Sequence, residues 1–233
     1  MRKNGVRTML MGGQACVFYG GAEFSRDLDL LILADSENLL CLRNALAELE
    51  AEPIGVPGLE LRHLEHGLAV HFRCFADEVA GLRIDLMSSL REMPPFDVLW
   101  NRRTVIDSEG EKIDLMALED LVQTKKTQRD KDWPMIRRLV EHSWFTGEGT
   151  PRFWLRQLRT PELLLEAVQA HPQVAGHLAP ERQAVSAAIR GDLAGVIAAL
   201  DSEEKAERAA DREYWEPLKH ELELLRRNRL RKD

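Results

Sequence analysis

The order of apolar and polar positions predicts two β-strands at the start of the chain. Residues 6–11 form an apolar run that ends at Gly12-Gly13, and a second run covers residues 27–33. Side chains alternate across a strand, so the second run places Asp27 and Asp29 on one face and its leucines on the other. A short amphipathic segment and a glycine-rich turn separate the two runs. The pattern therefore predicts strand, glycine turn, short helix and strand.

The same reading predicts further strands and helices up to residue 146. Apolar residues at helical spacing predict helices, and short apolar runs between Pro and Gly clusters predict strands. The predicted elements are a helix over 36–50 with Asp35 or Ser36 as its cap, strands over 68–74, 82–87, 103–106 and 112–115, a helix over 115–126, and a helix that starts at Pro134.

The best domain boundary is the stretch 145–151, which contains two glycines and a proline. Beyond it the pattern is helical throughout. The predicted helix starts are Thr160-Pro161, Ala179-Pro180 and the capping pattern at Asp201-Ser202. We predict a core domain over 1–145 and a helical C-terminal domain over 151–233. The fold class is α/β (α+β): a small mixed sheet with flanking helices, followed by a helical region.

The last predicted helix carries a narrow apolar seam among many charged residues. The seam consists of Trp215, Leu218, Leu222 and Leu225. Such a seam is typical of a helix that docks on a neighbouring helix or on a second subunit. A homodimer through the C-terminal helices is therefore a candidate assembly.

Composition narrows the class of protein. Of 233 residues, 44% are hydrophobic and 30% charged, which is ordinary for a globular protein. The net charge of −7 gives no global basic field for nucleic acid. No apolar run approaches the ~18 residues of a membrane span. The three cysteines Cys16, Cys41 and Cys74 are odd in number and widely spaced, which favours reduced thiols and a cytoplasmic location.

The paired acids of the second strand are the first candidate for chemistry. Asp27 and Asp29 lie roughly 7 Å apart on one face, where like charges raise each other's pKa unless a cation neutralises them. Mg²⁺ is the natural partner, because it takes one or two carboxylates together with substrate phosphates. The alternative to metal binding is that the two acids are simply solvated at the start of a strand. The glycine pair Gly12-Gly13 adds backbone N–H groups that can approach an anion closely.

These motifs resemble the signature of the DNA polymerase β-type nucleotidyltransferase superfamily. The order is a glycine pair, an Asp-x-Asp pair on the next strand, and a third carboxylate on a later strand, here Asp85. The segment 114–121 and the polar residues after it are similar to the helical segment of small bacterial nucleotidyltransferases, which include abortive-infection-type toxin enzymes. The polar residues of that match are Lys125, Arg129, Lys131 and Asp132.

The resemblance implies a metal-dependent transfer of an NMP group from an NTP to a hydroxyl-bearing acceptor, with release of pyrophosphate. It implies that Asp27, Asp29 and Asp85 hold Mg²⁺ or Mn²⁺ and that Asp85 helps to deprotonate the acceptor. The acceptor could be tRNA, a protein or a small molecule, and a toxin–antitoxin role is compatible with it. The candidate nucleotide-binding residues are Gly12, Gly13, Ser25, Arg26, Lys125 and Arg129.

Alternatives stay open for several of these residues. Asp85 could instead pair with Arg83 or Arg73. If the helix that starts near residue 115 continues, Lys125 and Arg129 share one face, which could simply be solvated. The chain as a whole could be a non-catalytic nucleotide-binding or interaction module that kept the fold.

Overall fold

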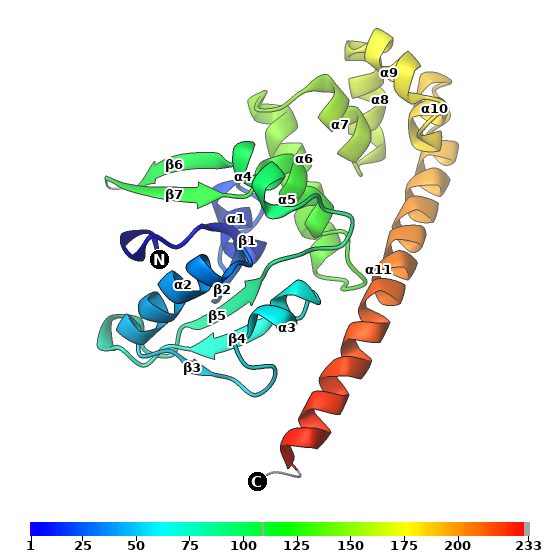
Figure 1. Cartoon of the computed structure of the whole chain (residues 1–233). Coiled ribbons are helices and arrows are strands. Elements are labelled where there is room, and N and C mark those ends of the chain that lie inside the picture. The colour runs from blue at the N-terminus through cyan, green and yellow to red at the C-terminus, as the bar shows by residue number, and fades with distance from the viewer. Residues whose placement is uncertain (109, 231–233) are drawn as a thin grey trace. The chain divides into compact units, whose positions relative to one another are not determined.

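The computed structural model of the chain describes residues 1–108 and 110–230 (Figure 1). Tertiary contacts divide the chain into two compact units. The sheet unit comprises Met1–Val17, Glu23–Thr124 and Glu213–Asp233, of which 231–233 lie outside the described residues. The helical unit comprises Phe18–Ala22 and Lys125–Arg212.

The sheet unit is built on one mixed sheet of seven strands in the order β3-β4-β5-β2-β1-β7-β6. The β2–β5 and β1–β7 pairs are parallel, and the other neighbours are antiparallel. The mixed sheet confirms the predicted fold class. The strands are β1 (Thr8–Met11), β2 (Asp27–Ile32), β3 (Glu52–Pro53), β4 (Val70–Arg73), β5 (Arg83–Met87), β6 (Thr104–Ser108) and β7 (Glu111–Leu115).

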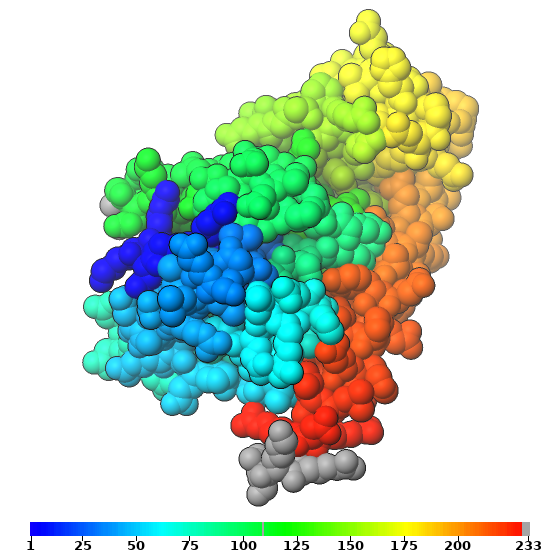
Figure 2. Space-filling model, viewed as in Figure 1, coloured from blue at the N-terminus to red at the C-terminus, as the bar shows by residue number. Residues whose placement is uncertain are grey.

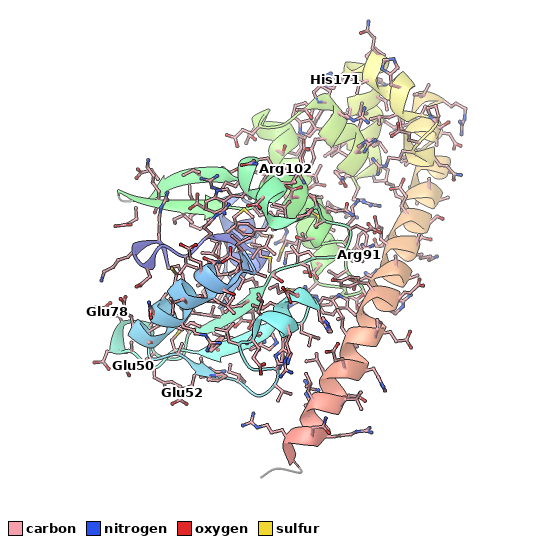
Figure 3. All side chains as sticks on the ribbon, viewed as in Figure 1. Glu50, Glu52, Glu78, Arg91, Arg102 and His171 are labelled. Carbon is pink, nitrogen blue, oxygen red and sulfur yellow. The ribbon has the colours of Figure 1, made fainter. Side chains whose placement is uncertain are left out.

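Helices and two short 3₁₀ turns accompany the strands of this unit. Figure 1 shows α2 lying along the sheet, and its start is capped as predicted, because the Asp35 side chain accepts from the Asn38 N–H at 2.6 Å. Arg102, at the end of α4, donates to buried Asp120 of α5 at 2.7 Å (Figure 3). The helices are α1 (Gly12–Phe18, whose last residue belongs to the helical unit), α2 (Ser36–Glu48), α3 (Leu61–Glu65), α4 (Phe96–Asn101) and α5 (Leu118–Thr124), with the 3₁₀ turns η1 (Arg2–Asn4) and η2 (Asp77–Val79).

The two faces of the central strands differ in polarity. Ile84 and Leu86 of β5 are fully buried, and Val70 and Phe72 of β4 are buried beside them. On the opposite face, β2 begins with acids and ends with the buried Leu31. The sheet therefore buries one face along its length and leaves a polar area where β2 begins.

The helical unit contains most of the remaining helices. Its α6 buries Ile136, Leu139 and Val140, as the periodicity predicts, and α8 begins at the predicted Pro161. His171 packs against Trp144 and Trp154, with ring centroids 6.1 and 5.8 Å away (Figure 3). The helices are α6 (Asp132–Thr146), α7 (Pro151–Gln157), α8 (Pro161–Ala170), α9 (Pro172–Leu178), α10 (Gln183–Ile189) and α11 (Leu193–Leu230), whose residues from Glu213 belong to the sheet unit.

Two predicted helix starts are wrong. Ala179-Pro180 lies in the turn between α9 and α10. The helix of this region, α9, starts instead at Pro172, where proline fits the first helical turn. Asp201-Ser202 lies inside α11, which starts at Leu193. The residues between Leu193 and Asp201 are mostly alanine and aliphatic residues, with one glycine, so nothing ends the helix before the capping pattern.

The compact units divide the chain differently from the predicted boundary at 145–151. Helix α6 precedes that boundary but packs on α7 in the helical unit. The last part of α11, red in Figure 2, belongs to the sheet unit. In that unit Glu221 Oε1 lies 3.4 Å from His66 Nδ1. Part of the predicted apolar seam, Leu218, lies beside Gly67 there. Independent folding of 1–145 and 151–233, and a homodimer through the seam, stay predictions.

No helix in the ranges 1–108 and 110–230 is long and apolar enough to cross a bilayer. The predicted cytoplasmic location stays a prediction.

Candidate active site

The sheet register brings the three predicted acids onto one face. In the parallel pair β2–β5, Asp29 lies opposite Asp85 and Asp27 lies opposite Arg83. Register partners share a face, and so do residues two apart on one strand. Asp27 is exposed, and Asp29 and Asp85 are half-buried. We call this area, with His71 and Arg83, the carboxylate face.

The glycine pair lies directly beside this face, at positions where a Cβ would overlap neighbouring side chains. A Cβ on Gly12 would collide with the carboxylate of Asp29, and one on Gly13 would collide with the Ser25 hydroxyl. Gly12 also has φ +67°, a conformation that glycine adopts without strain. The Gly13 N–H donates to Asp29 Oδ2 at 3.3 Å. The glycines therefore allow the backbone to approach the acid of β2.

The loop before β2 is held by side-chain hydrogen bonds. Gln14 of α1 donates from Nε2 to the Ser25 carbonyl at 2.6 Å. The Ser25 hydroxyl donates to the Asp27 carbonyl at 3.4 Å, and Arg26 is exposed. Gln14 was not among the predicted site residues, although its place in the first turn after the glycine pair could have indicated it.

Asp85 has two cationic or hydrogen-bonding partners in the structure. Its Oδ1 accepts from Arg83 Nε at 2.7 Å and lies 2.7 Å from His71 Nδ1. Arg83 Nη2 is also 3.3 Å from His71 Nδ1. The Arg83 pairing, left open by the sequence, is the one that forms, whereas Arg73 donates to the Gly81 carbonyl. His71 was missed as a site residue because only the β4–β5 register shows its partner.

These contacts set the protonation of the face. Burial acts to raise the pKa of Asp85, but hydrogen bonds from His71 and Arg83 outweigh it and hold that pKa below its ordinary value. The hydrogen bond to Asp85 raises the pKa of Arg83, with further support from the charges of Asp27 and Asp29. Asp85 is therefore a carboxylate, and Arg83 a cation, throughout the neutral range.

Lys125 and Arg129 have a different setting, in the helical unit. The helix before them, predicted over 115–126, covers Leu118–Thr124 and does not continue, so the two residues do not share a helix face. Lys125 is buried with its Nζ 3.4 Å from Asp132 Oδ1, and Arg129 donates from Nε to Asp132 Oδ2 at 2.7 Å. Thr127 donates to the same Oδ2 at 2.6 Å. Both predicted nucleotide-binding cations are thus paired with Asp132.

The carboxylate face supplies hard oxygen donors, but it is not assembled as a metal site. Within the described part of the chain, no group of three or more His, Cys, Asp or Glu side chains is arranged to hold a metal ion. The physical reason at Asp85 is that Oδ1 faces Arg83 and His71. Asp27 and Asp29 still fit Mg²⁺ chemically, since one or two carboxylates with substrate phosphates are its usual ligands.

Comparison with known proteins gives a likeness in structure alone. No protein-family model matches the chain, and no curated protein matches it. Among solved structures, the chain is similar to the crystal structure of an antigenic nucleotidyltransferase-like protein from Paracoccidioides brasiliensis. The two are 17% identical, the match covers 76% of this chain and 86% of that chain, and the TM-score is 0.42.

Proposed function

We propose that the chain is a metal-dependent nucleotidyltransferase and that the carboxylate face is its active site. The observation that carries the proposal is the pairing of Asp29 with Asp85 on parallel strands, with Asp27 on the same face. The glycine pair Gly12-Gly13 borders these acids at positions where a Cβ would overlap the side chains of Asp29 and Ser25. Acids crowded on a face beside bare backbone suit a polyanionic substrate that arrives with a divalent cation.

The reaction is the displacement of pyrophosphate by a hydroxyl group. The acceptor oxygen bonds to the α-phosphorus of the NTP, the bond from that phosphorus to the bridging oxygen breaks, and the hydroxyl proton passes to a base. Asp27, Asp29 and Asp85 would hold Mg²⁺ or Mn²⁺, which neutralises phosphate charge and activates the attacking oxygen when bound. Ionised Asp85 would help to take the proton, and positioning and charge neutralisation would supply most of the rate enhancement.

The remaining residues of the proposal contact the nucleotide. The bare backbone at Gly12-Gly13 would let the phosphates approach closely. Ser25 and Arg26 precede the acids and would contact the triphosphate. Lys125 and Arg129 stay predicted nucleotide-binding residues, and their pairing with Asp132 makes such a role secondary to a structural one. Following the resemblance, the acceptor would be a tRNA, a protein or a small molecule, and a toxin activity would be one use of the reaction.

One observation favours a second candidate function. Asp85 is held by Arg83 and His71, and the residues the structure describes contain no ready three-ligand metal group. A non-catalytic module that binds a nucleotide or a protein partner would have no need of such a group. The two candidates differ in turnover: the module would bind without transferring label.

A transfer assay separates the two candidates. The protein is incubated with each α-labelled NTP, with Mg²⁺ or Mn²⁺, and with RNA, protein and small-molecule pools from a cell extract. Asp29→Asn is the test variant, and Asp77→Asn, an exposed acid of η2, is the matched control for the loss of one carboxylate. We expect wild type and Asp77→Asn to label one pool and Asp29→Asn to lose at least about a hundredfold in rate.

The outcomes of the transfer assay distinguish the enzyme from the non-catalytic module. Label in one pool that disappears with Asp29→Asn, while that variant unfolds like the wild type, supports the enzyme and names its acceptor class. Full activity of Asp29→Asn would refute the proposed site. Metal-dependent NTP binding with no label in any pool would favour the non-catalytic module.

A further inference from the structure

Arg83 is a cation placed among the acids of the carboxylate face. It precedes Asp85 by two residues on β5 and lies opposite Asp27, so its side chain emerges among the acids. It donates from Nε to Asp85 Oδ1 at 2.7 Å, with 37% of its side chain exposed. A half-exposed arginine can change partners at low cost, because water stabilises its guanidinium during the exchange.

The charges on this face show what Arg83 does without a ligand. Asp27 and Asp29 come from β2, Asp85 from β5, and His71 from β4. Asp85 Oδ1 accepts a hydrogen bond from Arg83 Nε at 2.7 Å and lies 2.7 Å from His71 Nδ1, so the guanidinium lies against one of the three acids. Arg83 thus supplies part of the neutralisation that a divalent cation would supply to the same acids.

A divalent cation and Arg83 compete for Asp85. Arg83 and His71 both approach Oδ1 of that carboxylate, so an ion sharing Asp85 as a ligand would meet the guanidinium as a like charge. A displaced Arg83 remains next to the acids that would hold the ion. Its planar fork of N–H donors matches two phosphate oxygens, whereas a lysine would offer only a point charge.

We propose that Arg83 is a substrate-positioning residue that exchanges partners, holding Asp85 in the free protein and binding a phosphate oxygen of the NTP once a divalent cation joins the acids. The inference rests on the proposed function, because it needs an NTP and a metal ion at this face. It adds a residue that the sequence analysis did not assign to nucleotide binding. It also explains why the three acids are not arranged as a metal site in the free protein: Arg83 holds Asp85.

If Arg83 exchanges partners, its removal should change the affinities for Mn²⁺ and for the triphosphate in opposite directions. Removing the guanidinium frees Asp85 for the ion, so Mn²⁺ alone should bind about tenfold more tightly. The same change removes a charge-assisted hydrogen bond to phosphate, so the triphosphate should bind about tenfold to a hundredfold more weakly. A residue that merely supported the fold would weaken both ligands together.

The test compares Arg83→Gln with Arg73→Gln by equilibrium binding. Arg73 lies opposite Arg83 on β4 and donates to the Gly81 carbonyl at 3.2 Å, so its removal makes the same charge change without touching Asp85. Mn²⁺ binding is followed by loss of the free-ion electron paramagnetic resonance signal. Binding of tripolyphosphate, and of each of the four α,β-methylene NTPs, is measured by calorimetry with saturating Mn²⁺.

We expect the opposite shifts for Arg83→Gln and unchanged constants, within about threefold, for Arg73→Gln. Arg83→Lys keeps the charge and serves if the glutamine variant folds poorly. It should bind Mn²⁺ like the wild type and the triphosphate several-fold more weakly.

Two failures are distinguishable. If wild type binds the analogues with Mn²⁺ and Arg83→Gln and Arg83→Lys both behave like Arg73→Gln, the exchange is refuted while the proposed function stands. If wild type binds neither Mn²⁺ nor any of the analogues, the proposed function fails and the exchange fails with it. Parallel weakening of both ligands in a folded Arg83→Gln variant would also overturn the exchange.

Discussion

Two clusters of acids and bases in this protein use the same residue types for different purposes. Asp132, in the helical unit, has a side chain that is only 1% exposed. It accepts from Thr127 at 2.6 Å and Arg129 at 2.7 Å, and it lies 3.4 Å from the buried ammonium of Lys125. The acid itself is closed to solvent and held by three donors, although one of them, Arg129, is 56% exposed.

The carboxylate face is the opposite case. Asp85 is 16% exposed and shares Arg83 with a face that also carries Asp27 and Asp29. Its acids outnumber its arginine, and the absence of a side chain at Gly12 leaves the space beside the backbone to the Asp29 carboxylate. The comparison teaches that a buried acid surrounded by donors stabilises a fold, whereas several partly exposed acids that share one arginine are suited to a cationic ligand.

The largest expected effect tests the closed cluster. Asp132→Asn would leave the buried Lys125 without its counter-charge, and breaking a buried pair in this way costs about 3–5 kcal/mol of unfolding free energy. Asp130→Asn is the matched control, because that acid is 98% exposed and pairs only at the surface with Arg208. Urea denaturation measures both variants. Equal stability of the two would show that the Asp132 cluster is not structural.

A second prediction concerns the bare backbone beside the acids. Gly12→Ala places a methyl group against the carboxylate of Asp29 at a backbone φ of +67°. Gly55→Ala is the control for backbone strain alone, because Gly55 has φ +79° and a methyl group there would meet no other atom within 4 Å. We expect Gly12→Ala to lose about 1–3 kcal/mol more unfolding free energy than Gly55→Ala in urea denaturation.

The same variants sharpen the comparison through activity. Gly12→Ala should also lose transfer activity, since Asp29 must move, while Gly55→Ala keeps it. Equal stability losses in the two glycine variants would mean that the space beside Asp29 is not restricted.

The smallest expected effect is a pH dependence at Asp85. Because its pKa is lowered in the folded protein, ionised Asp85 stabilises the native state at neutral pH. That contribution is present above the ordinary carboxyl pKa of about 4 and is lost as the pH falls through the lower folded value. The stability difference between wild type and Asp85→Asn should therefore shrink between pH 7 and pH 3 in urea titrations. A difference that grows with acid would contradict the assigned direction.

Single helices and strands are predicted well from the sequence. The prediction fails where the end of a helix or the pairing of a strand depends on residues far away in the chain. Strands β2 and β5 follow from alternation, and the cap of α2 follows from Asp35. The two-residue strand β3 was missed, because Pro53 reads as a loop and edge pairing leaves no periodic signal.

The site was predictable in part for the same reason. Charged residues are costly in an otherwise apolar strand. The acids of the carboxylate face can therefore be recognised as candidate site residues from a single sequence. The partners of Asp85 are set by the register of β4 against β5, and His71 looks like any other strand histidine until that register is known. The sequence left open whether Lys125 and Arg129 share a helix face, because no Gly or Pro marks the end of α5 at Thr124.

The most direct measurement is a crystal structure of the protein with Mn²⁺ and an α,β-methylene NTP that calorimetry shows to bind. Anomalous scattering locates the ion without reference to its ligands. The account predicts an anomalous peak in contact with Asp27 and Asp29, the triphosphate beside Gly12, and Arg83 turned from Asp85 to a phosphate oxygen. An ion and nucleotide bound away from the carboxylate face would contradict the account.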